Sequence, residues 1–286
     1  MKFWQVLLTL ILAAAVSWGV SEFNRPAASD AGKETVYDRV VRTGTLNCGY
    51  FIWPPLHVKD PNTGAFSGIS YEVTQEIGRV TGLKINWAGE LAFSTYLTDI
   101  QSGRYDAECG QGWPNGVRGK LTFYSKPFGF IPLVAVVREG DMRFDSGPEK
   151  LNSPDVTLAT MDGETGFMVA RNRLPDANQV MLTQNSNSLD MIMNVVTNKA
   201  DATLVDALTA EGFMRENPGK VRMVQYKEPL HLIALNFTLP QDEKLRSMID
   251  VATDELLQSG AVEAIFKKYE TTPGVIWRVG ETYKKN

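Results

Sequence analysis

Hydrophobic and polar positions follow two different periods along the chain from Tyr37 onward. Mostly apolar stretches rich in β-branched residues predict strands, whereas apolar residues spaced three or four apart predict helices with one buried face. In the first half we expect helices at 36–44, 69–82 and 95–103, strands at 45–51, 83–88 and 105–112, and a loop with two turn signals at 53–68.

The second half of the chain shows the same kind of pattern. We expect strands at 131–139, 155–161, 201–207 and 231–237, a helix at 188–199, and two closing helices within 243–269. Alternating strands and helices are typical of parallel sheets covered by helices. Ligands of such open sheets bind beyond the carboxyl ends of the strands. Both the 110–118 loop and Asp206 follow predicted strands in this way.

The first twenty residues carry a separate hydrophobic pattern. Lys2 precedes an apolar run at 7–16, which matches the charged and hydrophobic parts of a secretory signal peptide. No clear cleavage site follows, and the segment 3–20 is just long enough to cross a bilayer. Residues 1–20 are therefore expected to be either a cleaved signal peptide or an uncleaved inner-membrane anchor. Export is expected in both cases, with residues 21–36 as a polar linker.

Composition sets the size of the protein and excludes several classes. The 286 residues exceed an average domain, so two lobes or domains are expected. An apolar share of 43% and a charged share of 22% are ordinary for a soluble globular protein. The formal net charge of −4 gives no basic surface for nucleic acid. The two histidines and two cysteines are too few and too scattered for a zinc site of usual spacing, and no metal or cofactor is expected.

A glycine-rich segment at 104–120, RYDAECGQGWPNGVRGK, is the strongest candidate for chemistry. A Walker-type phosphate loop needs Gly-Lys followed by Ser or Thr, but Leu121 follows here. A dinucleotide fingerprint needs G-x-G-x-x-G, but these glycines are spaced one residue too far and a proline interrupts the helix start. What remains is a strand end and a turn that present Arg118. Its guanidinium suits a carboxylate, because the two pair through parallel hydrogen bonds; a solvated arginine is the ordinary alternative.

Seven segments, in this order, resemble the bacterial extracellular solute-binding proteins of family 3, the amino-acid-binding receptors of ABC importers. They are GTLNCGYFIWPPL, GAFSGISYEVTQEIGRVTG, LTDIQSGRYDAECGQGWPNGVR, LTFYSKPF, DGETG, NKADATLVD and LLQSGAVEAIFKKY. The resemblance runs from about Val40 to about Tyr269. It implies an α/β, two-lobed periplasmic-binding-protein-like (type II) fold with parallel-type sheets and a hinge of two crossings. Lobe 1 would hold 37–128 and 238–286, and lobe 2 would hold 129–237.

The resemblance also implies two roles by position. Arg118 matches the arginine that clamps the α-carboxylate of the ligand, and Asp206 matches the acid that accepts its α-ammonium group. The two charges would lie on opposite lobes, so a ligand with both groups would bridge them and hold the lobes shut by hinge closure. An aspartate at a strand end is otherwise usually a helix cap.

The sequence departs from the family pattern around the expected ligand. A Trp-Pro-Asn segment replaces the usual hydroxyl and Ile-Thr before the arginine, and Asn115 is expected to stand in as a donor. Ile69 replaces the phenylalanine that usually covers the ligand. Phe51, Trp53 and Trp113 are expected to line the cleft and stack on the ligand, although an isolated aromatic residue is more often part of a core.

The positions of Thr165 and Glu108 each leave alternatives open. Thr165, in the glycine turn of the second lobe, is expected to donate to the ligand carboxylate or to cap a helix. Glu108 replaces an apolar residue in a central strand, and a buried carboxylate needs a partner or a proton. We favour a structural pairing of Glu108 with Arg104 or another basic side chain over contact with a cationic ligand.

Cys48 and Cys109 lie at similar depths in strands that the family places side by side. Exported cysteine pairs often form disulfides, but neighbouring parallel strands are an awkward place for a bridge. A disulfide and two buried thiols both stay open.

Three functions compete. The favoured one is a monomeric periplasmic binding protein that captures an amino acid or a related small carboxylate for an ABC transporter permease. The second is a dehydratase-like enzyme on the same scaffold, with Glu164 or Glu108 as its acid or base. The third is a membrane-tethered ligand sensor. A receptor is favoured over an enzyme because the arginine loop contains no histidine and neither glutamate has a partner that explains a shifted pKa.

Overall fold

The computed structural model describes residues 34–280 except 185 and 225. The predicted signal peptide or anchor at 1–20, and most of the predicted linker at 21–36, lie outside the described residues. Within the described part of the chain, no helix is both long and apolar enough to cross a membrane. The elements below all belong to one compact unit that begins at Val36.

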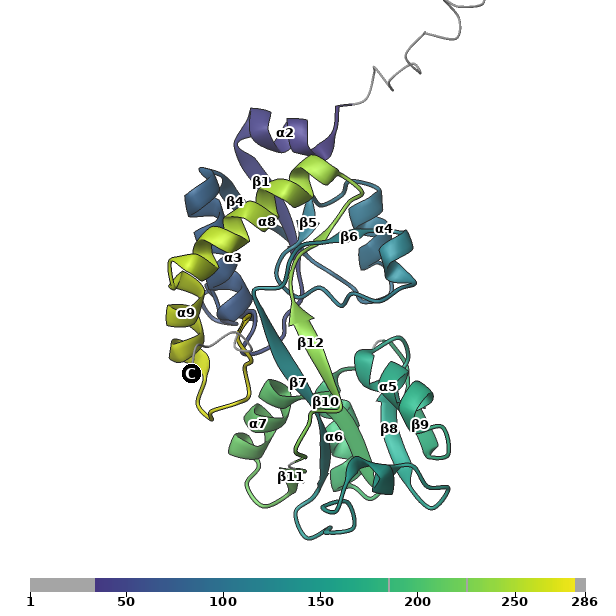
Figure 1. The fold of residues 1–286 in the computed structure, drawn as a ribbon. Helices are drawn as coiled ribbons and strands as arrows, with labels where there is room; N and C mark the ends of the chain where they lie inside the picture. The colour runs from purple at the N-terminus through teal and green to yellow at the C-terminus, as the bar shows by residue number, and fades with distance from the viewer. Residues whose placement is uncertain (1–33, 185, 225, 281–286) are drawn as a thin grey trace, which may run out of the picture. The chain divides into compact units, whose positions relative to one another are not determined.

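The first sheet has five strands in the order β4-β1-β5-β13-β6 (Figure 1). β1 pairs in parallel with β4 and β5, as the alternating pattern predicts, whereas β13 pairs antiparallel with β5 and β6. The strands are β1 (Thr45–Tyr50), β4 (Lys84–Glu90), β5 (Ala107–Glu108), β6 (Phe123–Tyr124) and β13 (Thr238–Leu239). Its helices are α2 (Val36–Thr43), α3 (Ile69–Thr81), α4 (Tyr96–Gln101), α8 (Glu243–Gln258) and α9 (Ala261–Tyr269).

The second sheet runs β11-β7-β10-β8-β9, with β12 also paired to β7. β8 pairs in parallel with β9 and β10, while β7 pairs antiparallel with its three partners. The strands are β7 (Gly129–Arg138), β8 (Thr157–Met161), β9 (Asn178–Leu182), β10 (Ala202–Asp206), β11 (Val221–Met223) and β12 (His231–Leu235). Its helices are α5 (Thr165–Arg173), α6 (Ser188–Val196) and α7 (Ala207–Glu216).

Three short elements complete the chain. The predicted loop at 53–68 contains a small antiparallel pair, β2 (Val58–Lys59) with β3 (Phe66–Ser67). Two single 3-10 turns, η1 (Arg118–Lys120) and η2 (Pro148–Leu151), follow the glycine-rich loop and β7 respectively. Of these, η1 bears on function because it begins at Arg118.

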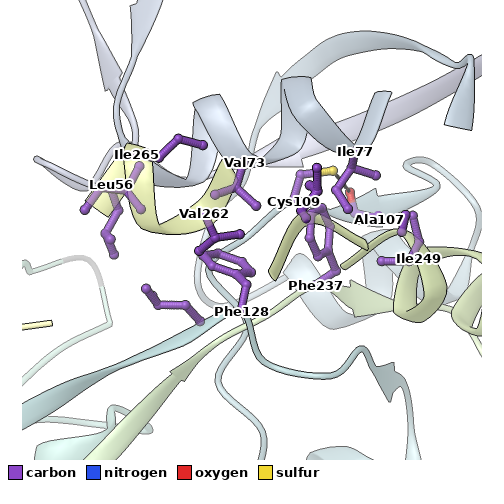
Figure 2. Packing of buried hydrophobic residues seen from close by; sticks show 14 of the residues in the cluster. Leu56, Val73, Ile77, Ala107, Cys109, Phe128, Phe237, Ile249, Val262 and Ile265 are labelled. Carbon is purple, nitrogen blue, oxygen red and sulfur yellow. Dashed lines mark hydrogen bonds between the residues drawn. The ribbon is translucent and has the colours of Figure 1, made fainter. Parts of the chain in front are cut away.

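Buried side chains from α3, α8 and α9 pack onto the segments that enter and leave the first sheet. Val73, Ile249 and Val262, one from each helix, belong to one core cluster with Phe128 and Phe237. Figure 2 shows these side chains converging. Phe128 directly precedes β7 and Phe237 directly precedes β13. The core therefore holds the two chain segments that run between the sheets.

β7 and β12 lie side by side in Figure 1 and pair from Gly129 with Leu235 to Leu133 with His231. The strands of the first sheet fall within 37–128 and 238–286, and those of the second within 129–237. The lobe boundaries themselves stay a prediction.

Cys48 and Cys109 form a disulfide, with Cα atoms 5.6 Å apart. In the β1–β5 ladder, Cys48 pairs with Ala107, and β5 ends at Glu108. Cys109 therefore lies just past the regular ladder, where the chain turns at Gly110 with φ of 97°. The bridge joins Cys48 to the residue two positions beyond its ladder partner, so neighbouring parallel strands do not prevent it here.

Candidate ligand-binding site

Arg118 is held at the start of η1 by the loop that precedes it. The Asn115 side chain accepts hydrogen bonds from the backbone N–H groups of Val117 (3.0 Å) and Arg118 (2.9 Å), which fixes the turn. The Arg118 guanidinium donates from Nη1 to the Trp113 carbonyl (2.9 Å) and from Nη2 to the Gly163 carbonyl (2.8 Å). Asn115 therefore positions the arginine, and its amide nitrogen lies 3.7 Å from the Met168 sulfur.

Aromatic rings surround Arg118 and the loop. The guanidinium carbon lies 5.3 Å from the Phe93 ring centre and 5.8 Å from that of Tyr96, which are cation–π distances. Trp113, 9% exposed, packs against Phe51 (5.1 Å between ring centres) and Trp53 (5.6 Å). The predicted aromatic residues thus form one cluster beside the arginine.

Asp206 ends β10 and caps α7. Its Oδ1 accepts a hydrogen bond from the Thr209 backbone N–H (2.8 Å). Its Oδ2 is buried and has no hydrogen-bond partner among the described residues. Burial raises the pKa of Asp206 above its ordinary value, although the hydrogen bonds from Thr209 oppose this. The cap expected of such an aspartate is present, and one oxygen remains for another partner.

Asp206 lines a small cavity between strands of the second sheet and the loops at 53–56 and 111–113. The described residues that line it are Trp53, Leu56, Gln111, Gly112, Trp113, Ile131, Glu164, Asp206, Ile233, Ala234 and Leu235. Its volume of about 10 Å³ is roughly that of one water molecule. In this arrangement an amino acid does not fit, so ligand entry requires the walls to move apart.

Glu164 is the second acidic residue that lines this cavity, and the resemblance to the family assigns it no role. It caps α5, because its Oε2 accepts from the Gly166 backbone N–H (2.6 Å). The cap is therefore Glu164 and not Thr165, which is the first residue of the helix and half-buried. Burial raises the pKa of Glu164 to about 7, and the negative charge of Asp206 adds to the increase. The sequence signal that could have identified Glu164 is a carboxyl side chain within the glycine turn DGETG.

Gln111 also belongs to the cavity, and sequence reasoning missed it. Its side-chain oxygen accepts from the Phe51 backbone N–H (3.3 Å), and its Nε2 is buried with no hydrogen-bond partner among the described residues. An unsatisfied amide donor and the unsatisfied Asp206 Oδ2 thus line the same space. Buried polar atoms in this state cost free energy unless a ligand or water completes them.

The structure gathers the predicted site residues only in part. Trp53, Trp113 and Asp206 line the cavity, whereas Arg118, Asn115 and Thr165 are not among its described lining residues. The Phe51 ring packs against the Trp113 ring. Ile69, fully buried at the start of α3, packs in the main core and is not among the described lining residues.

Glu108 corrects one expectation. It is fully buried and accepts from the Gln111 backbone N–H (2.7 Å) and the Thr238 hydroxyl (3.0 Å). Arg104 pairs instead with Asp99 (3.1 Å), and the ion pairs of the described residues include none of Glu108, so the expected partner, Arg104 or another basic side chain, is wrong. Burial raises the pKa of Glu108 to about 8. Its partner is therefore a proton, together with two neutral donors.

A larger cavity of about 370 Å³ also has Trp53 in its lining. Its lining includes Pro54, Phe213 and Tyr269, but neither Arg118 nor Asp206. Of the two predicted charged residues, Asp206 therefore lines the smaller cavity, and Arg118 is not among the described lining residues of either cavity. Among the described residues, no cluster of His, Cys, Asp and Glu side chains could hold a metal ion.

Comparisons with known proteins bear on this site. The model of the family described as bacterial extracellular solute-binding proteins, family 3, matches residues 46–272. The "Probable histidine-binding protein" of Campylobacter jejuni is 21% identical over 206 residues, 71% of this chain and 77% of that protein. The "Probable amino-acid-binding protein YxeM" of Bacillus subtilis is 21% identical over 272 residues, 94% of this chain and 95% of that protein.

A solved structure is similar along most of the chain. It is the ancestral amino acid-binding protein AncCDT-1, described as a precursor of cyclohexadienyl dehydratase. It matches with a TM-score of 0.70 and 21% identity over 82% of this chain and 99% of that one. At this identity the likeness establishes the two-lobed α/β fold alone.

Proposed function

This chain belongs to the bacterial extracellular solute-binding proteins of family 3, and from that membership we propose that it captures an amino acid or a related small carboxylate outside the cytoplasm and delivers it to an ABC transporter. The observation that carries the proposal is Asp206. The residue is 4% exposed, one carboxyl oxygen lacks a partner among the described residues, and Asp206 lines a cavity between the second sheet and the loops at 53–56 and 111–113. A ligand ammonium group would complete it.

Arg118 supplies the complementary half of the proposal. Its two outer nitrogens donate to two backbone carbonyls, one before η1 and one before α5. A ligand carboxylate is a stronger acceptor than a carbonyl, because charge-assisted pairs are shorter and stronger than neutral ones. The carboxylate would take over these two donors as a bidentate partner.

Hinge closure follows from where these groups reside. Arg118 belongs to predicted lobe 1, whereas Gly163 and Asp206 belong to predicted lobe 2. The Arg118–Gly163 bond and the Trp53–Thr209 bond (3.0 Å) both join the two predicted lobes. A ligand that binds both charges would favour the closed arrangement, because its affinity for that arrangement is higher.

The Cys48–Cys109 disulfide supports the proposed export. Disulfides persist in oxidising compartments such as the bacterial periplasm and are rare in the cytosol. We propose that the mature protein works in the periplasm, either free or tethered through its N-terminal segment.

The test is a binding screen followed by one matched pair of variants. Amino acids and small carboxylates are screened by thermal shift, since a ligand specific to the folded state raises Tm. Calorimetry then compares D206N with D242N. Both asparagines keep a helix cap, because Asp242 caps α8 through Lys244 and Leu245, and only D206N removes a charge from the cavity.

We expect D206N to weaken binding by a factor on the order of thirty or more, which is the usual cost of removing one member of a desolvated charge pair. D242N should bind like the wild type. The proposal fails if no amino acid or small carboxylate shifts Tm, or if the two variants bind equally.

A second function, acid–base catalysis, is favoured by one observation. Glu164 lines the cavity with a pKa raised to about 7, which suits a general acid or base near neutral pH. Glu108 is not among the described lining residues and drops out of this role. Recovery of the ligand after long incubation, followed by NMR, separates the functions. A receptor returns it unchanged, whereas an enzyme returns a product that E164Q no longer forms.

A further inference from the structure

Glu164 and Asp206 bring two carboxyl groups to one cavity. They follow different strands: Asp206 is the last residue of β10, and Glu164 follows the turn after β8. β8 and β10 pair in parallel, so their carboxyl ends meet at the same edge of the sheet. Each caps the helix that follows it and keeps less than a tenth of its surface exposed, 6% for Glu164 and 4% for Asp206.

No positive side chain balances this pair inside the cavity. The described lining residues include no lysine, arginine or histidine. Backbone N–H groups of α5 stabilise the Glu164 carboxylate, chiefly that of Gly166, with Thr165 and Phe167. Arg118 is the cation beside the turn, and its guanidinium is directed to the Trp113 and Gly163 carbonyls. The cavity wall itself is thus acidic.

The other walls suit a positively charged group. The rings of Trp53 and Trp113 lie 5.6 Å apart and tilted by 48°, and both line the cavity. Aromatic faces attract cations, most strongly when water is excluded. Buried Asp206 Oδ2 has no partner among the described residues. Two acids, an unsatisfied oxygen and two indole rings form a site for positive charge.

Resting on the function proposed above, we propose that Glu164 selects the charge of the ligand. With Arg118 at +1 and the two acids at −1 each, the ionised site carries −1. An amino acid with a basic side chain carries one carboxylate and two cationic groups, and so neutralises it. A neutral amino acid leaves Glu164 either protonated or as an uncompensated buried charge, and the second state is costly.

The test compares two ligands of nearly equal shape. L-Arginine carries a charged guanidinium group where L-citrulline carries a neutral urea group. Calorimetry measures Kd for both with the wild type, E164Q, E164D and E139Q. Gln and Asp can both accept the helix-capping hydrogen bond. E139Q removes an equal charge from an exposed position away from the cavity.

We expect the wild type and E139Q to prefer arginine by at least about tenfold, since unpairing a buried charge pair commonly costs this much or more. E164Q should reduce the arginine-to-citrulline preference by about tenfold, and E164D should restore most of it. Arginine binding near pH 7 should also release protons, seen as a dependence of the binding enthalpy on the buffer, and E164Q should release fewer.

Each other outcome has one meaning. If the wild type binds citrulline or other neutral amino acids as tightly as arginine, or if E164Q keeps the preference, the assignment of Glu164 is wrong while the receptor function stands. If the protein binds arginine, citrulline and every other amino acid and small carboxylate tested too weakly to measure, the proposed function fails and the inference fails with it. Circular dichroism and Tm show whether each variant is folded.

Discussion

Arg118 shows why the position requires arginine and not merely a positive charge. Its planar head reaches two carbonyl oxygens on different elements, those of Trp113 and Gly163, while its face lies near Phe93 and Tyr96. A lysine ammonium is a point charge and cannot present two parallel donors in one plane.

We therefore expect R118K to bind the ligand at least about tenfold more weakly than the wild type, and R118A more weakly still. Calorimetry with the ligand found in the screen measures both. Arg104 gives the matched control, because it is exposed and pairs only with Asp99 among the ion pairs of the described residues. R104K should bind normally, and equal binding by R118K would remove Arg118 from the site.

Glu108 makes stability depend on pH. Burial raises its folded-state pKa to about 8, above the value of an unfolded chain. Its contribution to stability is complete below the unfolded pKa of about 4.3 and is lost as the pH rises through about 8. E108Q stays neutral and can keep both hydrogen-bond contacts, so it should escape this loss.

We expect the free energy of unfolding of E108Q to exceed that of the wild type by a few kcal/mol at about pH 8.5, and the gap to narrow towards about pH 5, since each pKa unit corresponds to about 1.4 kcal/mol. Urea unfolding at both pH values measures the gap. Glu164 and Asp206 also have raised pKa values and weaken both proteins alike, so the difference isolates Glu108. A gap that is constant with pH would contradict the ionisation of Glu108.

At the scale of elements, sequence patterns predicted the strands and helices with a strong apolar period and missed those without one. The predicted helices at 69–82 and 188–199 are α3 and α6, and the final pair is α8 and α9. Helix α5 was missed because its sequence, TGFMVARNR, has no regular apolar stripe. Strand β9 was missed because four of its five residues are exposed.

Weak local patterns also explain which residues of the candidate site were not predicted from the sequence. Arg118 and Asp206 could be predicted as candidates because they follow strand patterns in segments that resemble the family. Glu164 caps α5, which was not predicted, so its burial beside Asp206 could not be anticipated. Gln111 was missed because its role depends on the turn at Gly110, which the strand pattern hides.

The packing of α5 against β10 gives a prediction with an internal control. A Cβ on Gly166 would lie 2.3 Å from the Leu204 carbonyl oxygen, so G166A should destabilise the fold by roughly 1–3 kcal/mol, as overpacking does. A Cβ on Gly212 of α7 would meet only the Arg215 side chain, at 4.0 Å. G212A should therefore stabilise the fold by about 1 kcal/mol through helix propensity.

Chemical denaturation of both variants measures these changes. The two substitutions are chemically identical, so opposite signs would show that α5 lies hard against the sheet and holds Glu164 in place. Equal effects on the free energy of unfolding would mean that the turn at 163–166 can shift to accommodate the added methyl group.

For the whole protein, the predicted lobes imply a change of shape on binding. The Arg118–Gly163 and Trp53–Thr209 bonds join them in the arrangement described here. We expect saturating ligand to change the radius of gyration measured by small-angle X-ray scattering, because the described arrangement is closed around a space too small for an amino acid and the lobes must move about the hinge to enclose one. D206N at the same ligand concentration should keep the ligand-free value. An unchanged radius in the wild type would argue against hinge closure.

The cavity beside Asp206, with room for about one water molecule, has a kinetic consequence. A solute can enter only during the fraction of time in which the walls stand apart, so the apparent affinity is reduced by that fraction. In stopped-flow mixing, the observed rate should therefore level off as solute concentration rises, at the frequency of opening. The same gate acts on escape, so a molecule once enclosed stays until the walls next part.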